Sequence, residues 1–396
     1  MGNVKYVTLS PAQRAWWDDL YHLDPRSTGI DRVQVLETSY DPQPTGLLDV
    51  PSPKIGDSSL NSMFFSSLTR IADLQTRDFV VHPVSKENWE NGDYVVGEVV
   101  PPLSHLSYVE LTDGRMANLL EGDLVLGAFG VRRATLEAVG DWQSIGPDGR
   151  FENMTAAGLF GRVTSKSFLL SQITSLVYRG HVLREGRKVR MQDFGLPARD
   201  LPYDCPTILI VGTSMSAGKT ITARIIIHLL KQFGLKVIGT KLTGAGRYRD
   251  ILAMSDAGAD KVFDFVDAGL PSSIVPPEVF RHSLRNLLAT IAAEKPDVVV
   301  AEAGASPYEP YNGSVVLEEI REQIRLTVLC ASDPYAVMGV SQSFGLMPDL
   351  VSGIAANTTA GIELVEKLTG FKTLCLAERD SLPQAAELLR EKLGIK

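Results

Sequence analysis

The chain reads TILIVGTSMSAGKT at residues 207–220, an apolar run followed by a loop that ends in Gly218-Lys219-Thr220. The run at 207–212 predicts a strand, and the pattern at 220–233 predicts an amphipathic helix. A glycine-rich turn between a strand and a helix presents backbone N–H groups and the positive end of the helix dipole to an anion. The lysine adds a point charge for phosphate oxygens and the threonine a hydroxyl for Mg²⁺, so the stretch predicts a phosphate-binding loop, or P-loop.

Strands and helices continue to alternate after this loop. Further apolar runs lie at 236–240, 297–303, 325–332, 350–357 and 372–378, with helical patterns between several of them. Continuous apolar strands separated by helices are typical of a parallel sheet covered on both faces. We therefore expect residues 205–396 to form a doubly wound α/β domain, mostly parallel, with six strands.

The N-terminal half has a different pattern, from which we expect a separate α+β domain over residues 1–200. Helices are expected from Ser10 and over 59–74, with a loop at 41–57 between them. Short alternating strands follow between about 94 and 193, and Asp-Gly pairs at 113–114 and 148–149 indicate tight turns. Many short strands with glycine-rich corners predict a small β-barrel or sandwich, joined by a proline-rich linker to the P-loop domain.

Composition excludes several classes of protein. The 396 residues suit two domains, and the formal charge of −8 argues against a nucleic-acid partner bound through a basic surface. The three cysteines, Cys205, Cys330 and Cys375, form no CxxC pair, so neither a disulfide scaffold nor a cysteine-based zinc site is expected. No run is long and apolar enough for a membrane helix or a signal peptide. We expect a cytoplasmic protein with no membrane partner.

The spacing within the P-loop points to a family. Five residues separate Gly212 from Gly218, one more than in the usual Walker motif, and this spacing resembles dethiobiotin synthetase. Further motifs follow in that family's order: Lys241-Leu-Thr-Gly after the second strand, Asp250 in RDILAM, Glu302-Ala-Gly-Ala at the end of a strand, and Gly353-Ile-Ala-Ala-Asn357. The resemblance extends over most of residues 207–385.

This resemblance implies ATP and Mg²⁺ as cofactors, with Lys219 and Lys241 as catalytic residues and Thr220, Asp250 and Glu302 as metal ligands. It places ATP on the P-loop and on the residue that follows a later strand: Gly212, Thr213, Ser214, Met215, Ser216, Ala217, Gly218, Lys219, Thr220, Ile221 and Asn357.

The residues by themselves support part of this assignment. Glu302 ends an apolar strand, at the edge where open α/β sheets bind ligands. Plainer interpretations also stand: Asp256, Asp260 and Asp264 are alternatives to Asp250, Lys241 could be a surface lysine, and Asn357 could simply end its strand.

Departures from the family limit what can be transferred. Ser214 and Ser216 stand where the family is commonly acidic, and neither the tail at 306–313 nor the N-terminal domain occurs in it. A looser resemblance is to two-domain P-loop proteins, some of which look like N-acetyltransferases of D-amino-acid catabolism. They share the loop spacing and a Glu302…Ser306…Pro310 pattern, but usually have Gln in place of Lys241.

The sequence thus favours a Mg-ATP-dependent ligase or synthetase that activates a carboxylate by phosphoryl transfer, or a small-molecule kinase. The alternatives are a CoA-dependent N-acyltransferase acting on an amino acid and a nucleotide-switch or assembly ATPase. The expected partner is a small molecule, a carboxylate or an amino acid, and we expect a homodimer. Arg132-Arg133 and 179–181 could bind an anion at the mouth of the barrel or be solvated hairpin charge.

Overall fold

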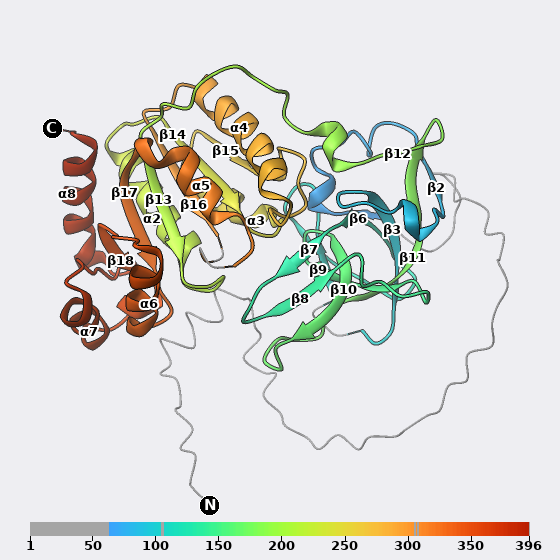
Figure 1. The fold of residues 1–396 in the computed structure, drawn as a ribbon, viewed down its shortest axis with the longest axis horizontal. Helices are drawn as coiled ribbons and strands as arrows, with labels where there is room; N and C mark the ends of the chain where they lie inside the picture. Colours follow the sequence, from blue (N-terminus) through green and yellow to red (C-terminus); the bar gives the residue numbers. More distant parts are fainter. Residues whose placement is uncertain (1–62, 104–106, 305, 307–308, 396) are drawn as a thin grey trace, which may run out of the picture. The chain divides into compact units, whose positions relative to one another are not determined.

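The P-loop sequence lies in a six-stranded parallel sheet in the computed structural model, which describes residues 63–103, 107–304, 306 and 309–395. The strand order is β15-β14-β16-β13-β17-β18, so β13, which leads into the P-loop, is an inner strand (Figure 1). The strands are β13 (Thr207–Gly212), β14 (Val237–Thr243), β15 (Lys261–Asp264), β16 (Val298–Ala303), β17 (Ile324–Cys330) and β18 (Leu350–Ser352).

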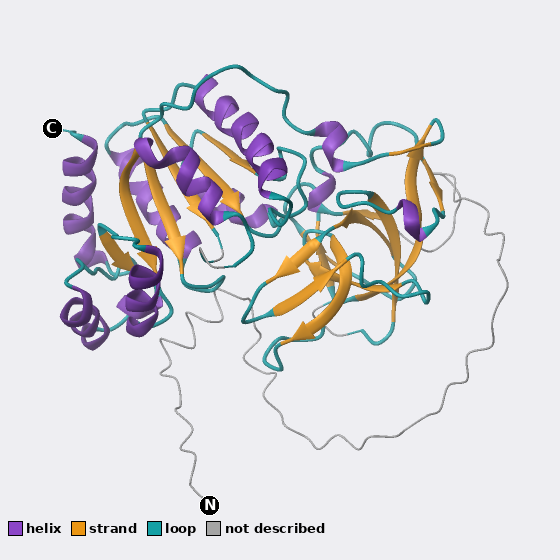
Figure 2. Cartoon of the chain, in the orientation of Figure 1, coloured by secondary structure: helices purple, strands orange, loops and turns teal. Residues whose placement is uncertain are grey.

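Helices cover both faces of this sheet (Figure 2). Because side chains alternate along each strand, neighbouring residues of one strand pack into opposite cores. Leu209 and Val211 of β13 pack into one core with helices α4, α5, α6 and α7, whereas Ile208 and Ile210 pack into the other with α2, α3 and α8. The helices are α2 (Lys219–Gln232), α3 (Tyr248–Asp256), α4 (Pro277–Ala293), α5 (Gly313–Ile320), α6 (Pro334–Phe344), α7 (Thr359–Thr369) and α8 (Leu382–Leu393). The doubly wound α/β prediction is confirmed.

One strand of that prediction is wrong. Residues 372–378 form no strand, and only Thr373 makes an isolated bridge, to Val351 of β18. The sixth strand is instead β15, which pairs with β14 at the other edge of the sheet. Its sequence, KVFD, is four residues long and charged at both ends, so it lacks the long apolar run on which the prediction relied.

The described part of residues 63–194, here called the β-rich region, forms a ten-stranded sheet and a separate two-stranded sheet of β4 and β5. Strand β6 pairs with β3, β3 with β11, β11 with β9, β9 with β10, and β10 again with β6, so these five strands close a ring. The region contains β1 (Met63–Phe65), β2 (Val80–His82), β3 (Tyr94–Val100), β4 (Tyr108–Glu110), β5 (Met116–Asn118), β6 (Leu124–Phe129), β7 (Val131–Arg133), β8 (Ala138–Asp141), β9 (Arg150–Thr155), β10 (Leu159–Lys166), β11 (Ser175–Arg184) and β12 (Arg187–Lys188).

Two local predictions in this part are wrong. The helix expected over 59–74 lies partly outside the described residues, and its described part contains β1 and the short 3₁₀ turn η1 (Ser67–Thr69). The short strands expected up to about 193 end earlier, at Lys188 of β12, and η3 (Met191–Phe194) follows. The helix expected from Ser10 and the loop at 41–57 lie outside the described residues.

Part of the β-rich region shares a core with the P-loop region, residues 207–395. Leu68 and Leu126 belong to the same buried apolar cluster as Val266 and Leu270. Burial of such side chains is worth about 1.5–3 kcal/mol each, so this shared core holds the two regions together. Among the described residues, none of the helices combines the length and the apolar character needed to cross a membrane.

Candidate nucleotide-binding site

The P-loop joins the carboxyl end of β13 to the first residue of α2. Gly218 precedes the helix with a φ of 99°, a left-handed conformation that favours glycine. No side chain at this position caps the helix, so the first N–H groups of α2, together with its dipole, form an end suited to an anion. A Cβ on Gly218 would approach the Gly353 Cα to 3.2 Å, so the turn after β18 packs closely against the loop.

Lys219 folds back over this loop. Its side chain is only 3% exposed, and its Nζ donates a hydrogen bond to the carbonyl oxygen of Ser214, 2.7 Å away. A Cβ on Gly212 would lie 2.8 Å from the same Nζ, so the glycine leaves room for the ammonium group. Burial lowers the pKa of Lys219, while the charge of Glu302 opposes that shift. A bound phosphate would oppose this shift further, because a nearby anion favours the charged form of the ammonium group.

Thr220 and Glu302 bring two kinds of oxygen together. The Thr220 Oγ1 donates to the Glu302 Oε2 at 3.3 Å, and Glu302 is 3% exposed near the carboxyl end of β16. Burial raises the pKa of Glu302, the negative charge of Asp250 adds to the rise, and Lys219 opposes it. A hydroxyl and a carboxylate are ligands that Mg²⁺ prefers, and a divalent ion would favour the charged form of Glu302.

Lys241 adds a second buried ammonium group to the site. It lies on β14 in register with Glu302 on β16, and its Nζ donates to the carbonyl oxygen of Ala245 at 3.1 Å. The same Nζ forms an ion pair with Asp250, which lies in the first turn of α3. Burial alone would lower the pKa of Lys241, but the carboxylates of Asp250 and Glu302 raise it overall.

We call Lys219, Lys241, Asp250 and Glu302 the edge cluster, because they gather at the carboxyl edge of the parallel sheet. The structure brings these four predicted residues together, each acting on the charge of the others. It places the carboxylate of Asp250 on Lys241, whereas the sequence assigned Asp250 to the metal. Its role as a metal ligand stays a prediction.

The remaining predicted residues lie along the same edge. The N–H of Thr213 donates to the carbonyl oxygen of Cys330 at 3.0 Å, which ties the loop to β17. Ala217 is fully buried, and Met215 packs against the larger core. Asn357 is exposed directly after η5 (Ile354–Ala356), the turn that follows β18. It is therefore accessible to a ligand at this edge, and adenine contact stays a prediction.

Sequence reasoning missed two carboxylates that reach this edge from the β-rich region. Glu137 accepts a hydrogen bond from the hydroxyl of the P-loop residue Ser216, at 3.2 Å. Glu110 is fully buried and accepts the N–H groups of Tyr248 and Arg249 at 2.8 and 2.9 Å, so it caps the helix that carries Asp250. No local pattern could have revealed either contact, because the partners lie 79 or more residues apart.

The donor set fits magnesium better than a tightly chelated metal. Within the described ranges, no three His, Cys, Asp or Glu side chains are grouped so that they could hold a metal ion. Mg²⁺ usually takes one or two protein ligands and completes its shell with water and phosphate oxygens. Thr220 and Glu302 supply such a pair next to the P-loop, so the residues present fit this ion.

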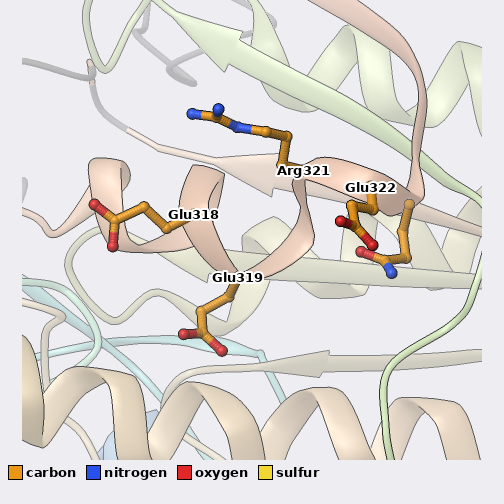
Figure 3. Close-up of a pocket in the computed structure, with 5 residues that line it drawn as sticks. Glu318, Glu319, Arg321 and Glu322 are labelled. Atoms are coloured by element: carbon orange, nitrogen blue, oxygen red, sulfur yellow. The ribbon is translucent and has the colours of Figure 1, made fainter.

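A shallow hollow lies elsewhere on the P-loop region. It has a volume of about 370 Å³ and is lined by Glu318, Glu319, Arg321, Glu322 and Gln323 (Figure 3). These residues end α5 and form η4 (Arg321–Gln323), which immediately precedes β17. Because β17 runs parallel to β13, the hollow lies toward the amino edge of the sheet and takes no part in the edge cluster.

Comparison with known proteins gives likenesses of fold. No protein-family model and no curated protein matches this chain. Solved structures that resemble it include chloroplast FtsY from Physcomitrella patens, with 15% identity and a TM-score of 0.32 over 50% of this chain and 66% of that one. Another is the hydrogenase maturation factor HypB from Archaeoglobus fulgidus, with 14% identity and a TM-score of 0.33 over 48% and 91%.

A third is a DUF1611 family protein from Anabaena variabilis, with 14% identity and a TM-score of 0.31 over 51% of this chain and 61% of that one. This chain thus spans somewhat less than two thirds of the FtsY and DUF1611 structures. Fold by itself does not assign a function.

Proposed function

We propose that this chain is a Mg²⁺-dependent P-loop enzyme that transfers the terminal phosphoryl group of a nucleoside triphosphate, ATP in the first instance, to a small carboxylate. The observation that carries the proposal is Lys241, a second buried lysine in register with Glu302 and beside the P-loop lysine. A protein that only binds nucleotide needs Lys219. A second ammonium group at this edge suits charge that develops on a group in transfer.

Each residue of the site would have a separate task. Lys219 and the first N–H groups of α2 would bind phosphate oxygens, and Thr220 with Glu302 would hold Mg²⁺. Lys241 would neutralise charge on the phosphoryl group as it leaves the nucleotide, with Asp250 holding its ammonium group in place. Mg²⁺, when bound, would supply further neutralisation of the phosphate oxygens.

The acceptor defines the class of enzyme. In a ligase, a carboxylate oxygen attacks the terminal phosphorus, the bond to the nucleoside diphosphate breaks, and an amine then displaces phosphate from the acyl group. This is the reaction type suggested by the resemblance to dethiobiotin synthetase, while the diamine substrate of that enzyme is not transferred to this chain. A small-molecule kinase would stop after the first step.

Calorimetric titration with MgATP, MgGTP and acetyl-CoA in parallel tests the nucleotide part of this proposal. We expect the wild-type chain to bind MgATP, and Lys219→Ala to weaken that binding by at least about 100-fold, because the buried ammonium group is the main charge that meets the phosphates. The matched control is Lys231→Ala in the last turn of the same helix, where the lysine pairs with Asp260. Unchanged MgATP affinity in Lys219→Ala would refute the P-loop assignment.

The other ligands separate the alternatives. Binding of acetyl-CoA with no binding of nucleotide would replace the ligase with an acyltransferase. Preference for MgGTP, with hydrolysis that no acceptor stimulates, would favour a nucleotide switch. A screen of small carboxylates and amines for stimulated release of nucleoside diphosphate then tests the acceptor, and a ligase requires stimulation by a carboxylate.

A further inference from the structure

One hairpin of the β-rich region contacts both loops that border the edge cluster. Its strands are β7 and β8, which pair antiparallel. The N–H of Arg133 donates to the hydroxyl of Tyr311 at 2.9 Å, and the N–H of Thr135 donates to the Glu309 Oε1 at 2.9 Å. Both acceptors lie in the segment between Glu302 and α5. Glu137 of the same hairpin contacts the P-loop. The hairpin is therefore bonded both to the P-loop and to the segment that follows Glu302.

The Glu137 carboxylate is held between two donors. One oxygen accepts from the Ser216 hydroxyl of the P-loop at 3.2 Å, and the other forms an ion pair with Arg132. Arg132 is 7% exposed, and its Nη1 donates to the carbonyl oxygen of Met154 at 2.5 Å. Its Nε is buried and has no hydrogen-bond partner among the described residues. The guanidinium therefore retains a donor that its present contacts do not use.

The Ser216 hydroxyl that Glu137 now uses belongs to the P-loop, where the proposed function places the phosphates of the nucleotide. Loop hydroxyls and guanidinium groups are the donors that phosphate oxygens take, and Arg bonds to phosphate are charge-assisted. A carboxylate and a phosphate repel one another, and the Ser216 hydroxyl can donate its one proton to only one of them. The Glu137 carboxylate is thus an anion of the protein itself, bound to donors that suit the terminal phosphate of a nucleotide.

We propose that Arg132 is a phosphate-binding residue of the nucleotide site and that Glu137 is an internal competitor, which the terminal phosphate displaces from Ser216 and from Arg132. This inference rests on the proposed function, because it requires a nucleoside triphosphate on the P-loop. It assigns to the β-rich region a direct role in binding the nucleotide. Binding of the terminal phosphate would change the contacts of the hairpin, because Glu137 would lose its hydrogen bond to the P-loop residue Ser216.

The test is a comparison of dissociation constants for MgATP and MgADP, measured by calorimetry. Glu137→Gln keeps the size of the side chain and removes its charge, so MgATP should bind about three- to tenfold more tightly. Arg132→Gln should weaken MgATP by about tenfold or more, because it removes a charge-assisted bond and leaves Glu137 uncompensated. MgADP, which lacks the terminal phosphate, should change by less than about twofold in both variants.

The double variant separates two roles of Arg132. If Arg132 contacts phosphate, Arg132→Gln combined with Glu137→Gln binds MgATP more weakly than Glu137→Gln alone. If Arg132 only neutralises Glu137, the double variant and Glu137→Gln bind MgATP equally, and the assignment of Arg132 is overturned. Weaker binding of MgATP by Glu137→Gln would overturn the competitor role.

Controls keep these outcomes apart from effects on folding and on the proposed function. Glu98 and Arg179 form an ion pair between β3 and β11 of the same region, so Glu98→Gln and Arg179→Gln are matched exchanges that should leave both affinities unchanged. Thermal unfolding identifies variants that do not fold. If the wild-type chain binds no nucleotide, the proposed function fails and this inference with it. If the wild type binds MgATP and the variants differ for MgATP and MgADP alike, the inference alone fails.

Discussion

Two clusters of buried charge in this molecule differ in what surrounds them. The edge cluster lies beside a glycine-bounded loop at the end of a parallel sheet. The second, here called the barrel cluster, consists of Asp93, Tyr178, His181 and Lys188 in the β-rich region. In it three donors converge on the Asp93 Oδ2: the Glu90 N–H at 2.7 Å, the Lys188 Nζ at 2.8 Å and the His181 Nε2 at 3.1 Å.

The barrel cluster is enclosed by aromatic rings. The indole ring of Trp89 lies 4.7 Å from the ring of Tyr178 and 5.7 Å from that of His181, measured between centroids. The Tyr178 hydroxyl contacts the His181 Nδ1 at 2.5 Å, so both ring nitrogens of the histidine have partners. Asp93 and His181 are fully buried. Because the Asp93 Oδ2 and both histidine nitrogens have protein partners, this arrangement suits a structural role.

The edge cluster is buried to a similar extent, but its charges are balanced less directly. Burial lowers the pKa of Lys219 and raises that of Glu302, so burial disfavours the charged form of both groups. Strained protonation of this kind is typical of sites whose partner is a ligand. The comparison teaches that burial of a charge does not by itself identify a site; a glycine-bounded loop and a helix N-terminus beside the buried charge add the features suited to an anionic ligand.

Asp93→Ala gives the largest expected effect and tests whether the barrel cluster is structural only. The substitution removes the acceptor that Lys188 and His181 share. Losing one partner of a buried ion pair costs about 3–5 kcal/mol, and because Lys188 keeps Glu90 as a partner, we expect the lower end, about 3 kcal/mol. We therefore expect that fall in the free energy of unfolding, measured with denaturant. The affinity of the folded fraction for MgATP should not change.

Glu98→Ala is the matched control for Asp93→Ala, because its pair with Arg179 is partly exposed and should contribute less than about 1 kcal/mol. Loss of MgATP affinity in folded Asp93→Ala would mean that the barrel cluster is coupled to the P-loop, contrary to the division drawn above.

The sequence predicted the P-loop and its sheet well, because phosphate binding requires particular residues at a strand–helix junction. Gly212, Lys219 and Thr220 therefore carry a local signal. The sequence did not predict β15, whose four residues look like a loop. It wrongly predicted a strand at 372–378, an apolar run that makes one isolated bridge. Those errors arise because edge strands are defined by their neighbours and not by their own composition.

The contacts of the β-rich region with the site could not be predicted. Glu137 is the one charged residue of the short turn 134–137, which carries no motif, and only the docking of the hairpin brings it to Ser216. The same holds for Glu110, whose carboxylate caps α3 from a distant part of the chain. Local motifs predicted which residues lie at the edge, whereas the contribution of the other region depends on tertiary packing.

Substitution of the two lysines of the edge cluster should affect different quantities, nucleotide affinity for Lys219 and the rate of phosphoryl transfer for Lys241. Lys241→Ala should leave MgATP affinity within about threefold and lower the rate of phosphoryl transfer by about 100-fold, or about 2.7 kcal/mol, because Lys241 would act on charge that develops during transfer. Nucleotide titration and single-turnover release of nucleoside diphosphate measure the two quantities.

Lys236→Ala, an exposed lysine just before β14, is the control and should change neither quantity. An equal loss of affinity and rate in Lys241→Ala would contradict the role assigned to Lys241 and would make both lysines phosphate-binding groups.

A third ion cluster, between the two regions, gives the smallest effect. Arg70 of the β-rich region pairs with Asp264 at 2.6 Å and with Asp267 at 2.9 Å, beyond the end of β15. Burial, together with the charge of Asp264, raises the pKa of Asp267 to about 6 from 3.8, and Arg70 opposes the rise. A raised folded-state pKa gives stability that is complete below the unfolded-state pKa and is lost as the pH rises through about 6.

The free energy of unfolding should therefore fall by about 1 kcal/mol between pH 5 and pH 7 from this group, and Asp267→Asn should remove that part of the slope. Asp260→Asn is the control: the pKa of Asp260 is lowered, with its hydrogen bonds to Lys231 and Val237 outweighing burial, so its titration affects stability only at more acidic pH. If the slope between pH 5 and pH 7 is the same in Asp267→Asn and the wild type, Asp267 is ionised throughout this range. The cluster between the regions would then resemble the barrel cluster, in which several donors surround one buried carboxylate oxygen, and not the edge cluster.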